Sequence, residues 1–166
     1  MPVRDTAAMG HHLLMGLAAG AVGTVALNIV TYLDMAVRAR PASGMPAETV
    51  EVLTKKAGID LAPNGKDQDV AENRKSGIGA LLGYATGLGV GLVYGAVRPH
   101  LGDVPKAVAG VGLGLAAMAG SDVPATALGI TDPTSWTSKD WASDIIPHLV
   151  YGLTAATAYD AFTNGR

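Results

Sequence analysis

The chain has 166 residues, of which 49% are hydrophobic and 16% are charged, and it contains 22 glycines and no cysteine. A soluble domain usually carries about 25% charged residues, so this composition favours a membrane protein. The net charge of −2 argues against a nucleic-acid partner, which would require a basic face, and the lack of cysteine excludes disulfides and thiolate metal sites.

Four apolar segments are predicted to be membrane-spanning helices, since about 20 residues cross the hydrocarbon core of a bilayer. They cover about residues 13–33, 78–97, 107–130 and 145–162. The first continues without a clear cleavage site, which favours a retained span over a signal peptide. The third contains Ser121, Asp122 and Pro124, and we expect it to be kinked or broken there.

The connections between these segments differ in length and polarity. Residues 38–75 form a long polar loop, in which residues 43–58 have the start and stop signals of a short amphipathic helix, with Ser43 as the candidate N-cap. We expect this helix to lie against the membrane surface or against the mouth of the bundle. Residues 61–76 are predicted as a polar linker, and residues 131–144 as a loop with two interfacial tryptophans.

The basic residues predict an orientation, because cytoplasmic loops carry an excess of Lys and Arg. Four crossings place both termini on one side of the membrane. The side with the two longer loops holds Arg38, Arg40, Lys55, Lys56, Lys66, Arg74, Lys75 and Lys139. The other side holds only Arg4, Arg98, Lys106 and Arg166. This excess favours a cytoplasmic position for the loops and an outside position for both termini.

Small residues recur at every fourth position within the apolar segments, most regularly in residues 78–97. Helices in lipid associate where small residues let their backbones approach closely. The candidate packing residues are Gly16, Gly20, Gly79, Gly83, Gly87, Gly91, Gly95, Gly110 and Gly114. Three interpretations stay open: the glycines pack the chain's own bundle, part of the row forms a homo-oligomer interface, or they line a pore.

Six polar residues within the apolar segments or at their ends form a candidate site, because such groups are costly in lipid. They are Asn28, Tyr32, Asp34, Asp122, Asp144 and His148. Asp144 and His148 are four residues apart, so they share a helix face and can pair. Histidine titrates near neutral pH, so this pair beside Asp122 suits proton relay or cation binding. The structural alternative is that Asp144 caps the last helix and His148 holds the bundle in register.

Catalysis has little support in the sequence. There is no HExxH motif, no phosphate-binding glycine loop and no Ser–His–Asp order of a hydrolase. A haem bundle needs facing histidines at similar depth, whereas His12 and His100 both border water. We therefore expect no enzymatic activity, no cofactor and no metal.

Several elements of residues 124–151 occur together in one known family. They are Pro124, the run from Leu128 to Thr131, Pro133, Trp141, Asp144 and the run from His148 to Tyr151. In these elements the chain resembles the YagU-like bacterial inner-membrane proteins, a family of undefined function. The resemblance implies a multi-span protein of the bacterial inner membrane, with Asp144 and His148 as family features. Pro147 departs from the family's glycine, and the loop at residues 38–75 does not align.

Together these features predict an all-α, integral-membrane four-helix bundle that forms a single domain over residues 1–166, with one short amphipathic helix in its long cytoplasmic loop. The leading functional expectation is a non-enzymatic protein that acts as a self-associating bundle, a scaffold or an accessory subunit. Its expected partners are the lipid bilayer and either a second copy or another membrane protein. The alternative is a small transporter or channel for protons, ions or a small solute that uses Asp122, Asp144 and His148.

Overall fold

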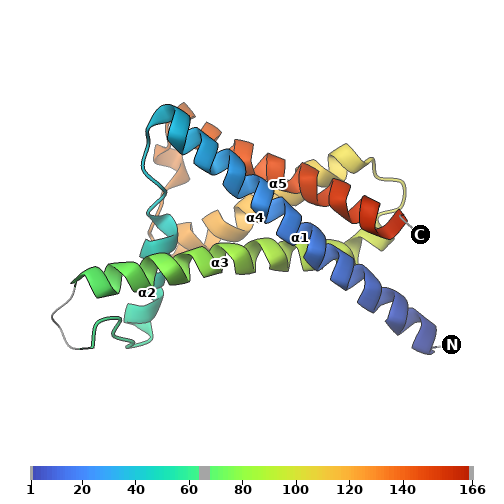
Figure 1. Cartoon of the computed structure of the whole chain (residues 1–166), viewed down its shortest axis with the longest axis horizontal. Helices are drawn as coiled ribbons and strands as arrows, with labels where there is room; N and C mark the ends of the chain where they lie inside the picture. Colours follow the sequence, from blue (N-terminus) through green and yellow to red (C-terminus); the bar gives the residue numbers. More distant parts are fainter. Residues whose placement is uncertain (1, 64–67, 165–166) are drawn as a thin grey trace.

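The computed structural model describes residues 2–63 and 68–164, and the chain is entirely helical within these ranges apart from its turns and loops. This confirms the all-helical expectation for the described residues. Four long helices run between the two ends of the molecule (Figure 1): α1 (Pro2–Arg38), α3 (Gln68–Val97), α4 (Lys106–Ala127) and α5 (Ser138–Asn164). The connections contain helix α2 (Met45–Lys56) and the short 3-10 helices η1 (Arg98–His100) and η2 (Pro133–Ser135).

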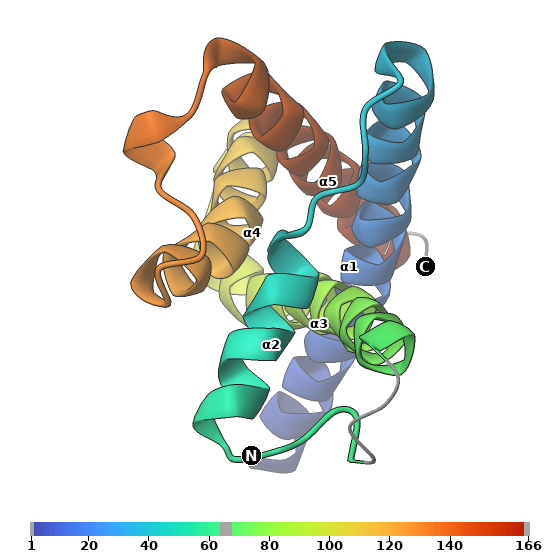
Figure 2. The ribbon, with the colours of Figure 1, turned by 90° about the vertical axis from the view of Figure 1, so that its left-hand side faces the viewer.

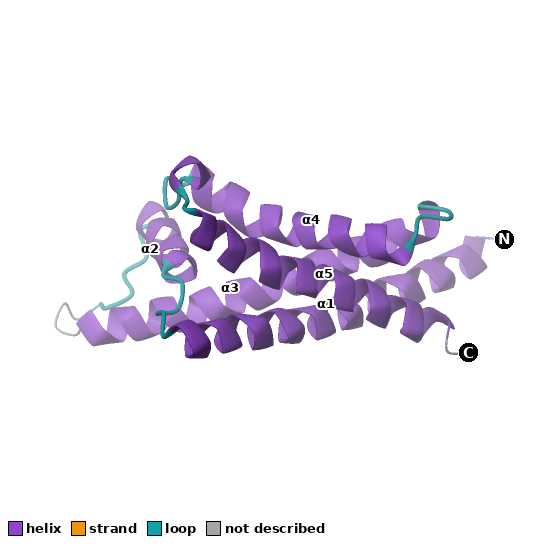
Figure 3. Cartoon of the chain, turned by 90° about the horizontal axis from the view of Figure 1, so that it is seen from above, coloured by secondary structure: helices purple, strands orange, loops and turns teal. Residues whose placement is uncertain are grey.

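Both chain termini lie at one end of the bundle, which we call the terminal end, together with the turn that contains η1 (Figure 1). Helix α2 and the connection between α4 and α5 lie at the opposite end, which we call the α2 end (Figure 3). Consecutive long helices therefore run antiparallel, as in an up-and-down bundle.

Three helices are long and apolar enough to cross a membrane: Ala7–Arg38, Gln68–His100 and Lys106–Ala127. Helix α5 is not among these candidates within the described residues, because Pro147, His148 and Asp160 interrupt its apolar sequence. These three helices are compatible with a multi-pass membrane protein. The fourth span stays a prediction.

The distribution of side-chain sizes fits a protein whose surroundings are lipid. Helix α1 packs on α3 and α5, and α5 also packs on α4. The buried core contains small and aromatic residues, among them Ala19, Ala117, Ala155, Ala156, Tyr94, Tyr151 and Tyr159. Large aliphatic side chains point outward, among them Leu14, Ile29, Leu81, Val93 and Leu115. Small residues inside and large apolar residues outside are typical of membrane helices that associate by close backbone contact.

Helical structure extends further into the connections than the sequence predicts. Residues 68–76 of the predicted linker form the first turns of α3, and α5 begins at Ser138. The loop prediction is therefore wrong for residues 138–144. The start of α5 is fixed by a reciprocal cap: the backbone N–H of Thr137 donates to Oδ2 of Asp140 at 2.9 Å, and the N–H of Asp140 donates to Oγ1 of Thr137 at 3.3 Å.

Helix α4 is continuous through Pro124, so the third span is not broken there, and it ends at Ala127. Gly129 follows with a φ of 73°, in the left-handed region that favours glycine. Its N–H bonds the carbonyl of Thr126, and the next N–H bonds the carbonyl of Ala125, both at 2.9 Å. This glycine cap ends the helix three residues before the predicted end of the span.

Helix α2 lies across α3 at the α2 end, which Figure 2 shows from that side. Its N-cap is Gly44 instead of the predicted Ser43. Val50 is 2% exposed and is the buried anchor of the helix. Gly79 of α3 permits the contact, because a Cβ there would lie 2.8 Å from the backbone of Pro46. Of the two predicted positions for this helix, the structure shows the one at the mouth of the bundle.

Candidate functional site

Three of the six predicted polar residues meet where α4 packs on α5. They are Asp122, Asp144 and His148, and we call them the buried acid cluster. Asp122 of α4 is 7% exposed, and its carboxyl group lies near the carboxyl group of Asp144 and the ring of His148. Nδ1 of His148 lies 3.4 Å from Oδ1 of Asp144 and 2.8 Å from the backbone oxygen of the same residue. Ser121 adds its hydroxyl group, 3.3 Å from Oδ1 of Asp122.

Glycine packing brings the two helices of this cluster together. A Cβ on Gly114 would lie 2.5 Å from the carbonyl oxygen of His148, and one on Gly152 would overlap the backbone of Gly110 and Gly114. Without side chains between them, the backbones of α4 and α5 approach closely. Asp122 lies two turns beyond Gly114, and Asp144 lies one turn before His148, so both carboxyl groups reach the same level.

Asp144 is not the helix cap that the structural alternative predicts, because α5 begins at Ser138 and Asp144 lies in its second turn. The side chains of Asp144 and His148 are only 19% and 15% exposed, respectively. Asp144 therefore points into the contact between the helices instead of serving backbone N–H groups at a helix end.

The buried acid cluster has more acceptors than donors. Oδ2 of Asp122 and Oδ2 of Asp144 are both buried and have no hydrogen-bond partner in the described part of the chain. Buried polar atoms in proteins nearly always have a partner, and two carboxylates that share a site repel each other. A single proton held between the two carboxyl groups removes both costs at once. The ranges that the structure describes contain no group of three or more acidic or histidine side chains placed to hold a metal ion.

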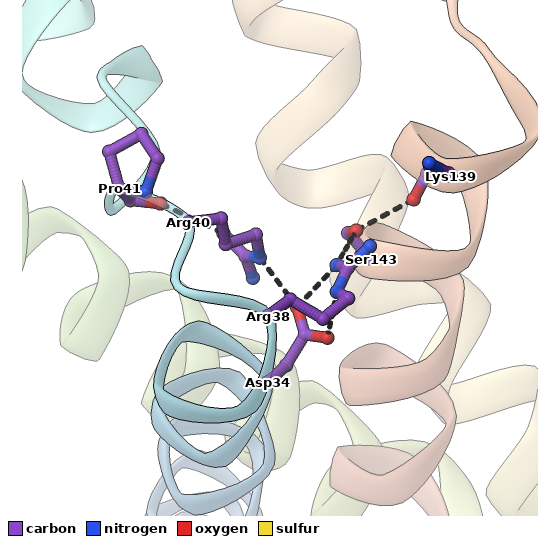
Figure 4. Close-up of polar contacts among 6 residues, drawn as sticks. All are labelled: Asp34, Arg38, Arg40, Pro41, Lys139 and Ser143. Atoms are coloured by element: carbon purple, nitrogen blue, oxygen red, sulfur yellow. Dashed lines mark hydrogen bonds and ion pairs between the residues drawn. The ribbon is translucent and has the colours of Figure 1, made fainter.

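The other three predicted residues lie apart from this cluster. Asp34 receives hydrogen bonds of 2.5 Å from Arg38 and Arg40, as Figure 4 shows. Tyr32 is 62% exposed and Asn28 is half-buried on α1. Neither makes a side-chain hydrogen bond within residues 2–63 and 68–164. The sequence reasoning missed Arg38 as a site residue, although its four-residue spacing from Asp34 is a signal for an ion pair on one helix face.

A second polar cluster, at the terminal end, was also missed. Nδ1 of His12 lies 2.7 Å from the hydroxyl oxygen of Tyr159, and the ring of Tyr159 packs edge-on against Tyr94 with 5.2 Å between centroids. The hydroxyl group of Tyr94 and Nε of Arg98 are buried without a hydrogen-bond partner among the described residues. His12 and Tyr159 are 147 positions apart, so no local pattern relates them.

The glycines of the predicted row on α3 have three different environments. Gly87, Gly91 and Gly95 face α1, where a Cβ on Gly91 would lie 2.5 Å from the carbonyl oxygen of Gly16 and 2.6 Å from Cα of Gly20. Gly79 faces α2, as described above. Gly83 has no heavy atom within 4 Å of its Cβ position. Most of the row is therefore occupied by contacts within the chain.

No family model matches the chain, and no curated protein or solved structure matches it. The resemblance to the YagU-like proteins therefore stays a prediction. Any proposal for the function of the chain rests on the geometry of the site.

Proposed function

We propose that this chain is a small multi-pass membrane protein that takes up, holds and passes on protons at Asp122, Asp144 and His148. The observation that supports the proposal is the pair of neighbouring carboxyl groups whose buried Oδ2 atoms have no donor in the described part of the chain. Glycine contacts already hold α4 on α5, and burying two acids in lipid adds a cost without adding packing. Ionisable groups in such positions are typical of proton and ion pathways.

In the proposed resting state Asp122 and Asp144 share one proton, and His148 is the neighbouring group that exchanges it. The ring of His148 lies 3.4 Å from Asp144, and histidine gains or loses a proton near neutral pH. Transfer of the shared proton to His148 leaves two carboxylates beside one imidazolium. His148 then releases this proton on the far side of the cluster and becomes neutral, and the next proton that arrives restores the acid–carboxylate pair. The cycle uses no covalent intermediate and no cofactor.

We propose α5 as the fourth span, which places this cluster within the membrane toward the α2 end. The excess of Lys and Arg favours a cytoplasmic position for that end and an outside position for both termini. The resemblance adds the bacterial inner membrane as the proposed location. His12 and Tyr159 supply titratable groups near the opposite end of the bundle, as a path across the membrane requires.

Proton flux into liposomes tests the proposal. The purified full chain is reconstituted with a pH-sensitive dye inside, and a potassium gradient with valinomycin drives the flux. We expect uptake above that of empty vesicles for the native protein and for Asp103→Asn, which changes an exposed acid in a turn. We expect Asp122→Asn and His148→Ala to lower uptake to the level of empty vesicles. Native uptake equal to that of empty vesicles, or full uptake by Asp122→Asn, would refute the proposal.

A second candidate function is the self-associating bundle, and the surroundings of Gly83 favour it. This glycine is exposed and is the member of the α3 row without a neighbour within 4 Å. A glycine inside a helix gains from its missing side chain only where another backbone approaches. We therefore propose Gly83 as the point where a second copy or another membrane protein packs on α3.

The mass of the detergent-solubilised protein tests this second candidate. Gly83→Leu is expected to convert an oligomer into a folded monomer. Gly87→Leu is the contrasting variant, because Gly87 faces Thr24 and Tyr151 inside the chain and its substitution is expected to unfold the protomer. A monomeric native protein, or an oligomer that Gly83→Leu leaves intact, would refute self-association through this residue.

A further inference from the structure

A groove lies between α1 and α5 at the α2 end, outside the buried acid cluster. Its volume is about 260 Å³. Val30, Ala142, Ile146 and Pro147 supply an apolar lining. The polar lining consists of Asp34, Arg38 and Ser143, which also form the contacts in Figure 4.

The guanidinium group of Arg38 is held in a fixed position beside this groove. Its Nε and Nη2 donate to the two carboxyl oxygens of Asp34, and Nη2 also donates to Oγ of Ser143 on α5, each at 2.5 Å. Ser143 in turn donates to the carbonyl oxygen of Lys139 at 2.6 Å. Asp34 also binds Nε of Arg40, so one carboxylate orients two guanidinium groups (Figure 4).

Both guanidinium groups keep donors for a ligand. Arg40 uses Nε for Asp34 and Nη1 for the carbonyl oxygen of Pro41. Within the part of the chain that the structure describes, Nη1 of Arg38 and Nη2 of Arg40 have no acceptor. Arg38 and Arg40 both contact Asp34, so two guanidinium groups share one carboxylate, and Asp140 lies further from Arg38. The two guanidinium groups therefore outnumber the one carboxylate that they contact, and Nη1 of Arg38 and Nη2 of Arg40 can donate to the oxygens of a phosphate group.

We propose that this groove binds an anionic phospholipid, with an acyl chain on the apolar lining and the headgroup phosphate on Arg38 and Arg40. The position supports a lipid, because Arg38 is the last residue of the candidate span Ala7–Arg38, where hydrocarbon gives way to headgroups. Exposed Ile146 continues the apolar lining toward the surrounding lipid. Basic pockets between membrane helices on the cytoplasmic side recognise anionic headgroups in this way. Free phosphate would use the guanidinium groups but leave the apolar lining empty.

Native mass spectrometry of the full chain in detergent tests the proposal with phosphatidylglycerol and phosphatidylcholine of identical acyl chains. We expect the native protein and Lys55→Gln, which removes an exposed charge on α2, to retain more phosphatidylglycerol. Arg38→Gln is expected to lose that preference, and Ala142→Phe is expected to lose retention of both lipids because it fills the groove. Excess glycerol phosphate is expected to leave lipid retention unchanged.

Three outcomes would overturn the proposal: equal retention of the two lipids by the native protein, an unchanged preference in Arg38→Gln, or full displacement of the lipid by glycerol phosphate, which would indicate a site for free phosphate. Helical content by circular dichroism identifies a variant that fails to fold. If Arg38→Gln unfolds, Arg38→Lys is measured in its place, because lysine keeps the positive charge without the planar guanidinium group. Arg38→Lys is then expected to prefer phosphatidylglycerol less strongly than the native protein does. A preference equal to the native one would overturn the phosphate contact.

Discussion

The hydroxyl group of Tyr151 donates a hydrogen bond of 2.5 Å to the backbone oxygen of Gly87, and both residues are buried. This bond joins α5 to α3 through the middle of the bundle. Thr24 of α1 lies at the same point, because a Cβ on Gly87 would overlap its Oγ1. Three helices therefore meet at one glycine, and the room that Gly87 leaves is filled by the side chains of Thr24 and Tyr151.

Tyr151→Phe is expected to lower the free energy of unfolding by about 1 kcal/mol, since it removes one hydrogen bond without creating a large cavity. Unfolding by sodium dodecyl sulfate, followed by circular dichroism in mixed micelles, measures the difference. Tyr84→Phe is the matched control, because Tyr84 is 46% exposed on α3. If both variants unfold at the native detergent fraction, the bond to Gly87 contributes no stability.

Gly91→Ala is expected to lower the free energy of unfolding by about 1–3 kcal/mol, the usual cost of overpacking a tight contact. The new methyl group would lie 2.5 Å from the carbonyl oxygen of Gly16 and 2.6 Å from Cα of Gly20, both backbone atoms that cannot rotate away. Gly89→Ala on the same helix meets nothing within 4 Å, and its melting temperature is expected to equal or exceed the native one. Equal melting temperatures for the two variants would contradict the close contact of α1 with α3.

The docking of α2 on α3 is expected to weaken only in strong acid. The pKa of Glu51 is lowered from 4.5 to about 2, because Lys55 and then Lys75 donate hydrogen bonds to it. Lys75 belongs to α3 and lies 2.7 Å from Oε2 of Glu51. A carboxyl group whose pKa is lower in the folded state stabilises that state fully above its ordinary pKa, and loses this effect as the pH falls toward the lowered value.

Spin labels measure this docking, and the absence of native cysteine makes the labelling specific. Labels at Lys56→Cys and Asn73→Cys, both exposed positions, report the distance between α2 and α3. We expect a constant distance from neutral pH to about 4.5 and a broadened distribution as the pH approaches about 2, where Glu51 gains its proton. Glu51→Gln is expected to give the broadened distribution at neutral pH. A transition centred at or above pH 4.5 would contradict the lowered pKa.

Thr137→Ala is expected to destabilise the first turn of α5 by about 1 kcal/mol, since the reciprocal bonds with Asp140 are lost. Hydrogen exchange of the amides in residues 138–141 measures this local effect. Thr157→Ala is the control, because Oγ1 of Thr157 is exposed and bonds a carbonyl of its own helix. If these amides exchange at the native rate in Thr137→Ala, the cap does not hold the start of α5.

The apolar segments predict where helices form but not where they end. Apolar runs indicate the part of a helix that lies in the hydrocarbon core. Helices α3 and α5 continue beyond this part into polar sequence, where caps and ion pairs stabilise them. Thr137 and Asp140 have the spacing of a helix start, and this local signal was available in the sequence. The helix is not broken at Pro124, because neighbouring packing tolerates a proline within a membrane helix, and the predicted kink stays a prediction.

The buried acid cluster is partly visible in the sequence. The four-residue spacing of Asp144 and His148 predicts a shared helix face, and Asp122 is conspicuous as an acid within an apolar segment. Their meeting depends on the register of α4 against α5, which the backbone contact of Gly110 and Gly114 with Gly152 produces. Register between helices is a tertiary property, and it also explains why the pairing of His12 with Tyr159 was missed.

Infrared spectroscopy of the protein in lipid at neutral pH measures most directly whether Asp122 and Asp144 share a proton. We expect the native spectrum to contain the carbonyl absorption of a protonated, buried carboxyl group, which persists in Asp103→Asn. Asp122→Asn is expected to abolish this absorption, because its amide donates to Asp144 and leaves that carboxylate ionised. A native spectrum without a protonated carboxyl group, or an absorption that Asp122→Asn leaves unchanged, would contradict the shared proton.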